Sequence, residues 1–391
     1  MAISNRQLIF IFFLSLLFYS CASGKLYVNA PGKIIQEEPS EIPSYTIYAL
    51  GDAGEANDQS KTVMQELARV SKGSKNPSMV IFLGDNIYPA GLPSEQDVDA
   101  YNEASDILLN QVKDLSSFGG NIVFIPGNHD WNEFKKGGLD AIRRQGKFLD
   151  QLESDKVSMI PKNGCGGPAV LELNNDVVML IIDSQWWIQD WSKEPQMNEG
   201  CDIQSKEAFI KDFRDKVALY KDKQIVVAMH HPFYTQGNHG GHFSIQDHIF
   251  PLTAVVKWLY LPLPVLGSIY PYYRSVIGSS QDLANARYKS LREEILDDLD
   301  YNGEMIFLSG HEHCLQYLTH EGDHFLISGA GSKQTEITDD KELVYGHKSG
   351  GFMKLDFYKD EEIWLTVYEV DPLTKTSIKV FSRPIIQKAS N

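Results

Sequence analysis

The stretch MVIFLGDNIY, residues 79–88, is an apolar run that ends abruptly in polar residues. An unbroken apolar run of this length is typical of a β-strand covered on both faces. Asp85 follows the run after one glycine, and Tyr88 comes three residues later. An Asp in that place is either a turn residue or helix N-cap, or a metal ligand. A Tyr at that spacing is rarer, and it restricts both the choice of metal ion and the type of reaction.

The same pattern recurs along the chain, and helical patterns separate its copies. The apolar runs with a polar ending are YTIYALGDAG, MVIFLGDNIY, NIVFIPGNHD, VVMLIIDS, IVVAMHHP, MIFLSGHEH and HFLISGAGS. Helices are expected at residues 59–71, 96–114, 139–152, 205–220 and 285–299. This alternation of strands and helices predicts an α/β fold. Near the C-terminus, residues 351–360 and 361–371 alternate like antiparallel strands and suggest a second, closing sheet.

Carboxylate, amide and imidazole side chains stand directly after these strands. They are Asp52, Asp85, Asn128, His230, His311 and His313. Ligands of open α/β sheets bind at the carboxyl ends of strands, so these side chains are expected to meet on one rim. With Tyr88 they offer seven donors, which suit two metal ions that share a bridging carboxylate. No Cys is among them, which argues against a structural zinc site.

Composition and cysteine content limit the class of protein. The chain has 391 residues, with 42% hydrophobic and 23% charged residues, as in globular proteins. Its formal net charge of −16 argues against a nucleic-acid partner. Cys165 and Cys201 lie in loop-like sequence and are expected to pair if the chain is exported. Cys314 directly follows GHEH and is expected to be a buried thiol.

The N-terminus predicts export. Leu8–Phe18 is an apolar run, preceded by Arg6, that is too short to span a membrane comfortably and fits a signal peptide over residues 1–20. Small residues around Cys21 resemble a bacterial lipoprotein signal with Cys21 lipidated, and ordinary cleavage near residues 22–24 is the alternative. The protein is thus expected to be a membrane lipoprotein or to be secreted. Residues 21–43 are expected to form a tether, and residues 44–385 the folded domain.

Five motifs, GDAG, GDNIY, GNHD, VAMH and GHEH, resemble in this order the signature of the purple acid phosphatases, a branch of the calcineurin-like metallophosphoesterases. The resemblance runs from about residue 45 to 331, and the size is similar to the small, tartrate-resistant-like form. It implies a four-layer αββα sandwich of two mixed β-sheets with helices on the outer faces. It also implies an acid phosphatase that hydrolyses phosphate monoesters of small molecules or other phosphoesters with a metal-bound hydroxide.

The resemblance also assigns roles to individual residues. Asp52, Tyr88 and His313 would hold the first metal, Asp85 would bridge, and Asn128, His230 and His311 would hold the second. A phenolate ligand favours Fe(III) at the first site, and the second metal is Fe, Zn or Mn. His129 would protonate the leaving alcohol, with Asp130 orienting its ring, and His239 would act beside the ligands. Asp130 is equally suited to capping a loop, and His231 is expected to be a structural hydrogen-bonding residue.

Two further functions remain open. One is a phosphodiesterase or lipid-phosphate hydrolase that uses the same metals, and the other is a non-catalytic binding or structural lipoprotein. The complete ligand set together with His129 argues against the non-catalytic lipoprotein.

An apolar insertion, about residues 247–285, interrupts the family pattern. Its segment 249–273 reads IFPLTAVVKWLYLPLPVLGSIYPYY, with four prolines and a lysine, and is a poor transmembrane helix. We expect either a lid packed on the core, the reading we favour, or a surface that meets a membrane.

Overall fold

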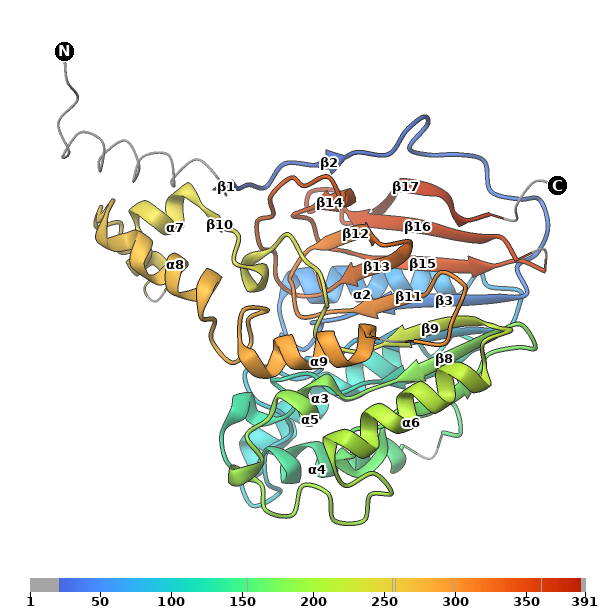
Figure 1. Cartoon of the computed structure of the whole chain (residues 1–391), viewed down its shortest axis with the longest axis horizontal. Helices are drawn as coiled ribbons and strands as arrows, with labels where there is room; N and C mark the ends of the chain where they lie inside the picture. The colour runs from blue at the N-terminus through green and yellow to red at the C-terminus, as the bar shows by residue number, and fades with distance from the viewer. Residues whose placement is uncertain are drawn as a thin grey trace.

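Two mixed β-sheets form the protein (Figure 1). The computed structural model describes residues 21–152, 154–254, 256, 258–297, 299–359 and 361–387, so the expected signal peptide lies outside the described residues. Within these ranges the first sheet has the order β17 (Ser377–Ile386), β16 (Ile363–Val370), β15 (Gly351–Phe357), β3 (Tyr45–Leu50), β4 (Ser78–Phe82), β5 (Asn121–Phe124) and β6 (Val157–Met159). The second has the order β2 (Tyr27–Val28), β14 (Leu343–His347), β12 (Leu315–His320), β13 (Asp323–Ser328), β11 (Ile306–Ser309), β9 (Gln224–Ala228), β8 (Val177–Ile181) and β7 (Ala169–Glu172).

The buried strands carry apolar residues on both faces because each sheet lies between two apolar layers. In β4, Met79 and Ile81 join the core between the sheets, whereas Val80 and Phe82 join the core beneath the helices. Successive side chains of a strand point to opposite faces, so a strand in this position has no face left for polar residues. The predicted sandwich of two mixed sheets with covering helices is confirmed.

The expected helices form, and their ends shift by no more than three residues. They are α2 (Asp58–Ser71), α3 (Val98–Asp114), α4 (Gly138–Asp150), α6 (Lys206–Leu219) and α9 (Ala286–Leu296), with a short α5 (Ser184–Ile188) besides. Side-chain caps define most of the starts; for example, Asn57 accepts from the Ser60 amide, and Ser205 accepts from the Ala208 amide.

The C-terminal strands depart from expectation. β15 and β16 do pair antiparallel, but β15 also pairs antiparallel with β3. They therefore extend the first sheet and do not make a sheet of their own. Alternating polarity predicts a hairpin, but it does not say which open edge the hairpin will cover.

Residues 21–43, for which we expect a tether, contact the domain at several points. β1 (Cys21–Ala22) pairs in parallel with β10 (Phe243–Ser244), β2 pairs antiparallel with β14, and Ile35 bridges to Ser382. Lys379 and Lys354 form ion pairs with Glu38. The sequence of this segment suggests a tether without partners. In the structure it pairs with β10 and β14 and forms ion pairs with Lys354 and Lys379.

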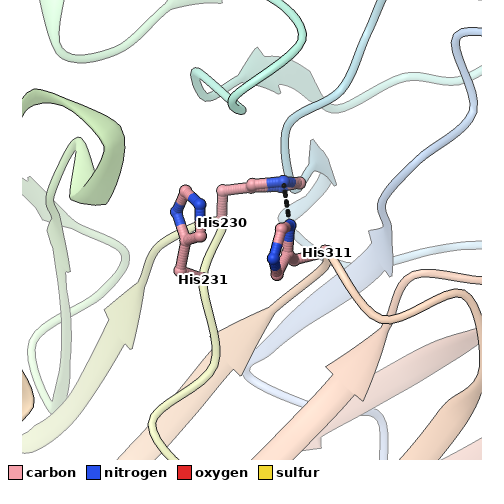
Figure 2. Close-up of side chains that lie close together, drawn as sticks. All are labelled: His230, His231 and His311. Atoms are coloured by element: carbon pink, nitrogen blue, oxygen red, sulfur yellow. Dashed lines mark hydrogen bonds between the residues drawn. The ribbon is translucent and has the colours of Figure 1, made fainter. Parts of the chain in front are cut away.

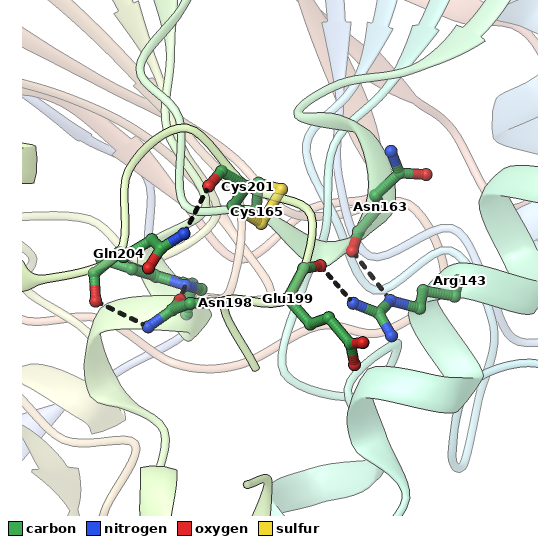
Figure 3. Close-up of a disulfide and its surroundings, with 8 residues drawn as sticks. Arg143, Asn163, Cys165, Asn198, Glu199, Cys201 and Gln204 are labelled. Carbon is green, nitrogen blue, oxygen red and sulfur yellow. Dashed lines mark hydrogen bonds between the residues drawn. A yellow bond between two sulfur atoms is a disulfide. The ribbon is translucent and has the colours of Figure 1, made fainter. Parts of the chain in front are cut away.

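The predicted disulfide is confirmed: Cys165 is bonded to Cys201 (Figure 3). Arg143 of α4 joins the two loops that carry the cysteines, because its guanidinium donates to the carbonyls of Asn163, at 3.2 Å, and Glu199, at 2.9 Å. A cross-link over a sequence separation of 36 residues lowers the entropy of the unfolded chain and so raises its free energy by about 3–4 kcal/mol. Cys314 is buried and free, as expected.

The apolar insertion forms α7 (Ile245–Ile249), α8 (Ile269–Val276) and short 3-10 turns. α7 and α8 project from one end of the two-sheet body (Figure 1). The favoured interpretation, a lid packed on the core, is wrong: Trp258 is 78% exposed and Val265 is 71% exposed. Among the described residues, no helix has the length and hydropathy that crossing a membrane requires.

Candidate metal centre

Every expected ligand lies in a loop that leaves the carboxyl end of a strand. Asp52 follows β3, Asp85 and Tyr88 follow β4, Asn128 follows β5, His230 follows β9, and His311 and His313 follow β11. Strands β3, β4 and β5 are parallel neighbours, and so are β9 and β11. The two sheets therefore deliver these loops to one place, which is the predicted rim.

The phenol of Tyr88 lies at the centre of the first group. Its Oη is 3.0 Å from Asp52 Oδ1, 3.0 Å from Asp85 Oδ2 and 3.2 Å from His313 Nε2. A phenol has one proton and cannot donate to two carboxylates at once. Burial, followed by the charges of Asp52 and Asp85, raises the pKa of Tyr88 well above its usual value. A cation bound between these oxygens would instead lower the pKa of Tyr88 and favour the phenolate.

The second group converges on the side-chain oxygen of Asn128. His230 Nε2 and His311 Nδ1 each lie 3.0 Å from Asn128 Oδ1. These two ring nitrogens are 3.2 Å apart (Figure 2). His230 Nδ1 donates to the carbonyl of Leu83 at 2.7 Å. In the neutral ring this bond leaves the lone pair on Nε2, which is the form that binds metal.

Asp85 joins the two groups. Its Oδ2 faces Tyr88, and its Oδ1 lies 3.4 Å from His230 Nε2. Burial opposes a charge on His230, but the Asp85 carboxylate outweighs burial and raises the pKa of His230 to about 9. The electrostatics of the pocket therefore favour a positive charge between these residues, which a metal ion would supply in place of a proton.

Backbone conformation aims three of the expected ligands. Asp52, Asp85 and His311 have φ of 57°, 53° and 68°, in the left-handed region that residues other than glycine seldom adopt. The glycine of GNHD is required by close approach, because a Cβ on Gly127 would lie 2.3 Å from Asp85 Oδ1. Likewise, a Cβ on Gly310 of GHEH would lie 2.6 Å from Asp52 Oδ2.

His129 lies beside the bridging carboxylate. Its amide donates to Asp85 Oδ1 at 2.9 Å, and its Nε2 lies 3.8 Å from Asp85 Oδ2. Its Nδ1 donates to the carbonyl of Pro89 at 2.6 Å. This bond orients the ring and leaves Nε2 directed toward the centre.

The expectation that Asp130 orients His129 is corrected. The Asp130 carboxylate accepts from the amide of Gly127 at 2.8 Å, and from the amide and side chain of Asn86, both at 3.0 Å. It therefore ties the GDNIY loop to the GNHD loop. This is the loop-capping alternative, and the carbonyl of Pro89 takes the orienting role instead.

Comparison with known proteins identifies the family. The family model described as "Calcineurin-like phosphoesterase" matches residues 45–315. The chain belongs to the calcineurin-like phosphoesterases. Two relatives from Arabidopsis thaliana are "Purple acid phosphatase 17", 23% identical over 73% of this chain and 69% of that protein, and "Purple acid phosphatase 7", 22% identical over 80% and 79%. The resemblance to purple acid phosphatases is thus confirmed at low identity, and the chain is a phosphoesterase of the hydrolase class.

A solved structure shares the fold of this phosphoesterase. It is titled "GAP50 the anchor in the inner membrane complex of Plasmodium", with a TM-score of 0.51, 13% identity, and coverage of 88% of this chain and 89% of the other. At that identity the likeness concerns the fold alone.

The donor set of this phosphoesterase fits two metal ions. The first group offers carboxylate and phenol oxygens with one imidazole, and the second offers an amide oxygen with two imidazoles. Hard anionic oxygens suit a small, highly charged cation, and imidazoles suit divalent Fe or Zn. The trio Asp52, Asp85 and His230 and the trio His230, His231 and His311 each bring their ligand atoms within 4.8 Å of one another.

His239 reaches the site through a contact that the sequence did not reveal. Its ring packs on His311, with centroids 4.0 Å apart, and its Nδ1 lies 3.0 Å from Asp282 Oδ1. Arg274 of α8 donates to Asp282 Oδ2 at 2.9 Å. Asp282 and Arg274 lie in or beside the insertion, where no strand ending or spacing marks them as functional.

His231 has the structural role expected for it. Its Nδ1 bonds to Ser184 Oγ at 2.8 Å, and its ring lies beside His230 and His311 (Figure 2). Burial, followed by the neighbouring His230, lowers the pKa of His231 well below its usual value, so the ring is neutral. The ring packs against His230 and His311, the two histidines expected to be ligands.

Proposed function

We propose that the protein hydrolyses phosphate monoesters at a dinuclear centre of Fe(III) and divalent Fe, Zn or Mn. The observation that carries this proposal is the position of Tyr88 Oη, within 3.0 Å of Asp52 and Asp85 and 3.2 Å from His313. A partly buried phenol between two carboxylates is a poor hydrogen-bonding arrangement and a good ferric site.

Each group of side chains has a distinct task in this proposal. Asp52, Tyr88 and His313 would hold the ferric ion, Asp85 would bridge, and Asn128, His230 and His311 would hold the divalent ion. When bound, the ions supply an activated water for in-line attack and positive charge for the phosphoryl oxygens.

His129 is the proton donor in this proposal. Its Nδ1 is committed to the Pro89 carbonyl, so Nε2 is the atom available to the leaving alkoxide. His239, held by Asp282, would orient the substrate phosphate beside His311.

The test is a visible spectrum with metal analysis of the purified protein and of Tyr88→Phe. We expect a purple phenolate-to-iron band and two metals per chain in the parent, and loss of the band in the variant. Tyr220→Phe is the matched control, since that phenol contacts Glu172 and is remote from the ligands. A colourless oxidised parent holding two divalent ions would remove the ferric assignment.

Hydrolysis of phosphodiesters or of lipid phosphates at the same centre is the second candidate. The exposed apolar insertion, whose Arg274 contacts Asp282 beside His239, favours it, because an amphiphilic substrate could approach along that surface. A higher kcat/KM for bis(p-nitrophenyl) phosphate than for p-nitrophenyl phosphate would replace the monoesterase proposal with this one.

We also propose that the chain is exported, either as a lipoprotein acylated on Cys21 or as a secreted protein. The apolar run Leu8–Phe18 and the confirmed disulfide support export. Mass spectrometry of the mature protein should show an acylated N-terminus at Cys21, or a free one near residues 22–24. Retention of residues 1–20 would contradict processing of either kind.

A further inference from the structure

We propose that residues 245–277, called here the apolar platform, dock the protein on the surface of a lipid bilayer. The platform holds twelve of the twenty large apolar side chains that are exposed among the described residues. They include Leu266 at 65%, Ile269 at 63% and Tyr272 at 66% exposure. Single exposed apolar residues are ordinary, but a concentration of this kind marks an interaction surface.

The charge of the platform distinguishes it from the rest of the chain. No carboxylate occurs between Asp247 and Asp282, although the chain as a whole carries a net charge of −16. The stretch contains two basic residues, Lys257 and Arg274, and Arg274 is paired with Asp282. The platform therefore has one carboxylate, Asp247, near its first residue, and the rest of this surface can approach an anionic bilayer with little local repulsion.

The kinds of apolar residue also fit a bilayer interface. Trp258, Tyr260, Tyr270, Tyr272 and Tyr273 are all exposed. Trp and Tyr prefer the level of lipid headgroups, where an apolar ring and a polar tip are both accommodated.

The chain enters the domain beside the platform, and this selects a membrane as the occupant. β1, the first described element, pairs in parallel with β10, and α7 begins directly after β10 at Ile245. The preceding residues 1–20 contain the apolar run Leu8–Phe18. A lipid on Cys21, if that residue is acylated as proposed, would therefore leave the domain at the edge of the platform. Two membrane-directed signals on one side of a domain reinforce one another.

The platform also lies close to the candidate active site. α8 presents Tyr272 and Tyr273 to solvent, yet its Arg274 is mostly buried and bonded to Asp282, which in turn contacts His239. Docking would thus bring the metal centre near the bilayer, although docking itself does not depend on catalysis.

The test measures cosedimentation of the chain starting at Ala22, which retains both sheets and lacks the apolar run and Cys21. The probes are vesicles of phosphatidylcholine alone and vesicles with added phosphatidylserine. The parent should sediment with both kinds of vesicle. A triple variant, Trp258→Glu, Val265→Glu and Leu266→Glu, should bind at least about tenfold more weakly.

The matched control places the same charges on exposed apolar residues elsewhere, as Val98→Glu, Leu219→Glu and Leu373→Glu. It should bind like the parent, and hydrolysis of p-nitrophenyl phosphate should be unchanged in both variants, which shows that they are folded. No binding by the parent, or equal binding by the triple variant, would overturn the proposal. So would a dimer that the triple variant dissociates in the absence of vesicle binding. An inactive parent that still binds vesicles would remove the phosphatase proposal and leave this one intact.

Discussion

Replacing Asp85 with Asn is expected to empty both metal positions and to lower kcat/KM on phosphate monoesters by at least about 10³-fold. Loss of a residue that only supports a ligand costs about 10–100-fold, and Asp85 contacts donors of both groups. Its Oδ2 meets Tyr88 Oη at 3.0 Å, and its Oδ1 lies 3.4 Å from His230 Nε2. An Asn keeps the shape of the side chain but removes its charge, so neither ion is bridged by an anion.

Plasma mass spectrometry of dialysed protein and steady-state kinetics would measure the two effects together. Asp106→Asn, at an exposed carboxylate of α3, is the control and should keep both metals. An Asp85→Asn protein that retained two metals and parental kinetics would show that Asp85 does not bridge them.

His129→Ala is expected to lower kcat by about 10²–10⁴-fold on an alkyl phosphate. The loss should be much smaller on p-nitrophenyl phosphate, because p-nitrophenolate leaves without a proton. The basis is the orientation of His129: Nδ1 donates to the Pro89 carbonyl, and Nε2 faces the centre beside Asp85. Metal content should stay at the parental value, since His129 is outside both groups of ligands.

Asp130→Asn separates the two roles considered for that residue. An Asn cannot accept all the bonds that the carboxylate takes from Gly127 and Asn86, so the loops should loosen. Asp130→Asn should lose the same fraction of activity on an alkyl phosphate and on p-nitrophenyl phosphate. The loss caused by His129→Ala should instead depend on the leaving group. If His129→Ala lost equal activity on both substrates, proton donation by His129 would be ruled out.

The ligand set could be predicted from sequence because each member follows a local rule. For Asp52, Asp85, Asn128 and His311 a strand is followed by a glycine and then by the polar residue, and parallel pairing of the strands brings their ends together. The glycines are explained by close approach, such as that between Gly127 and Asp85. Whether these residues bind metal in solution stays a prediction.

Other features depend on contacts between distant segments and could not be predicted in this way. Asp130 has the residue type and position of a catalytic partner, but the geometry of the neighbouring loop assigns it to Asn86. Asp282 and Arg274 meet His239 across an insertion that has no regular period. Residues 21–43 pack where β10 and β14 leave strand edges open, and the composition of the segment does not reveal these edges.

The pairing of β1 and β2 has a consequence for the order of assembly. These are the earliest described segments to be synthesised, yet their partners, β10 and β14, come from the middle and the late part of the chain. Closing so long a loop costs more entropy than pairing neighbouring strands such as β12 and β13, so we expect these contacts to form after the local ones. On this expectation, the N-terminal segment covers the edge of the second sheet only after β14 has taken its place there.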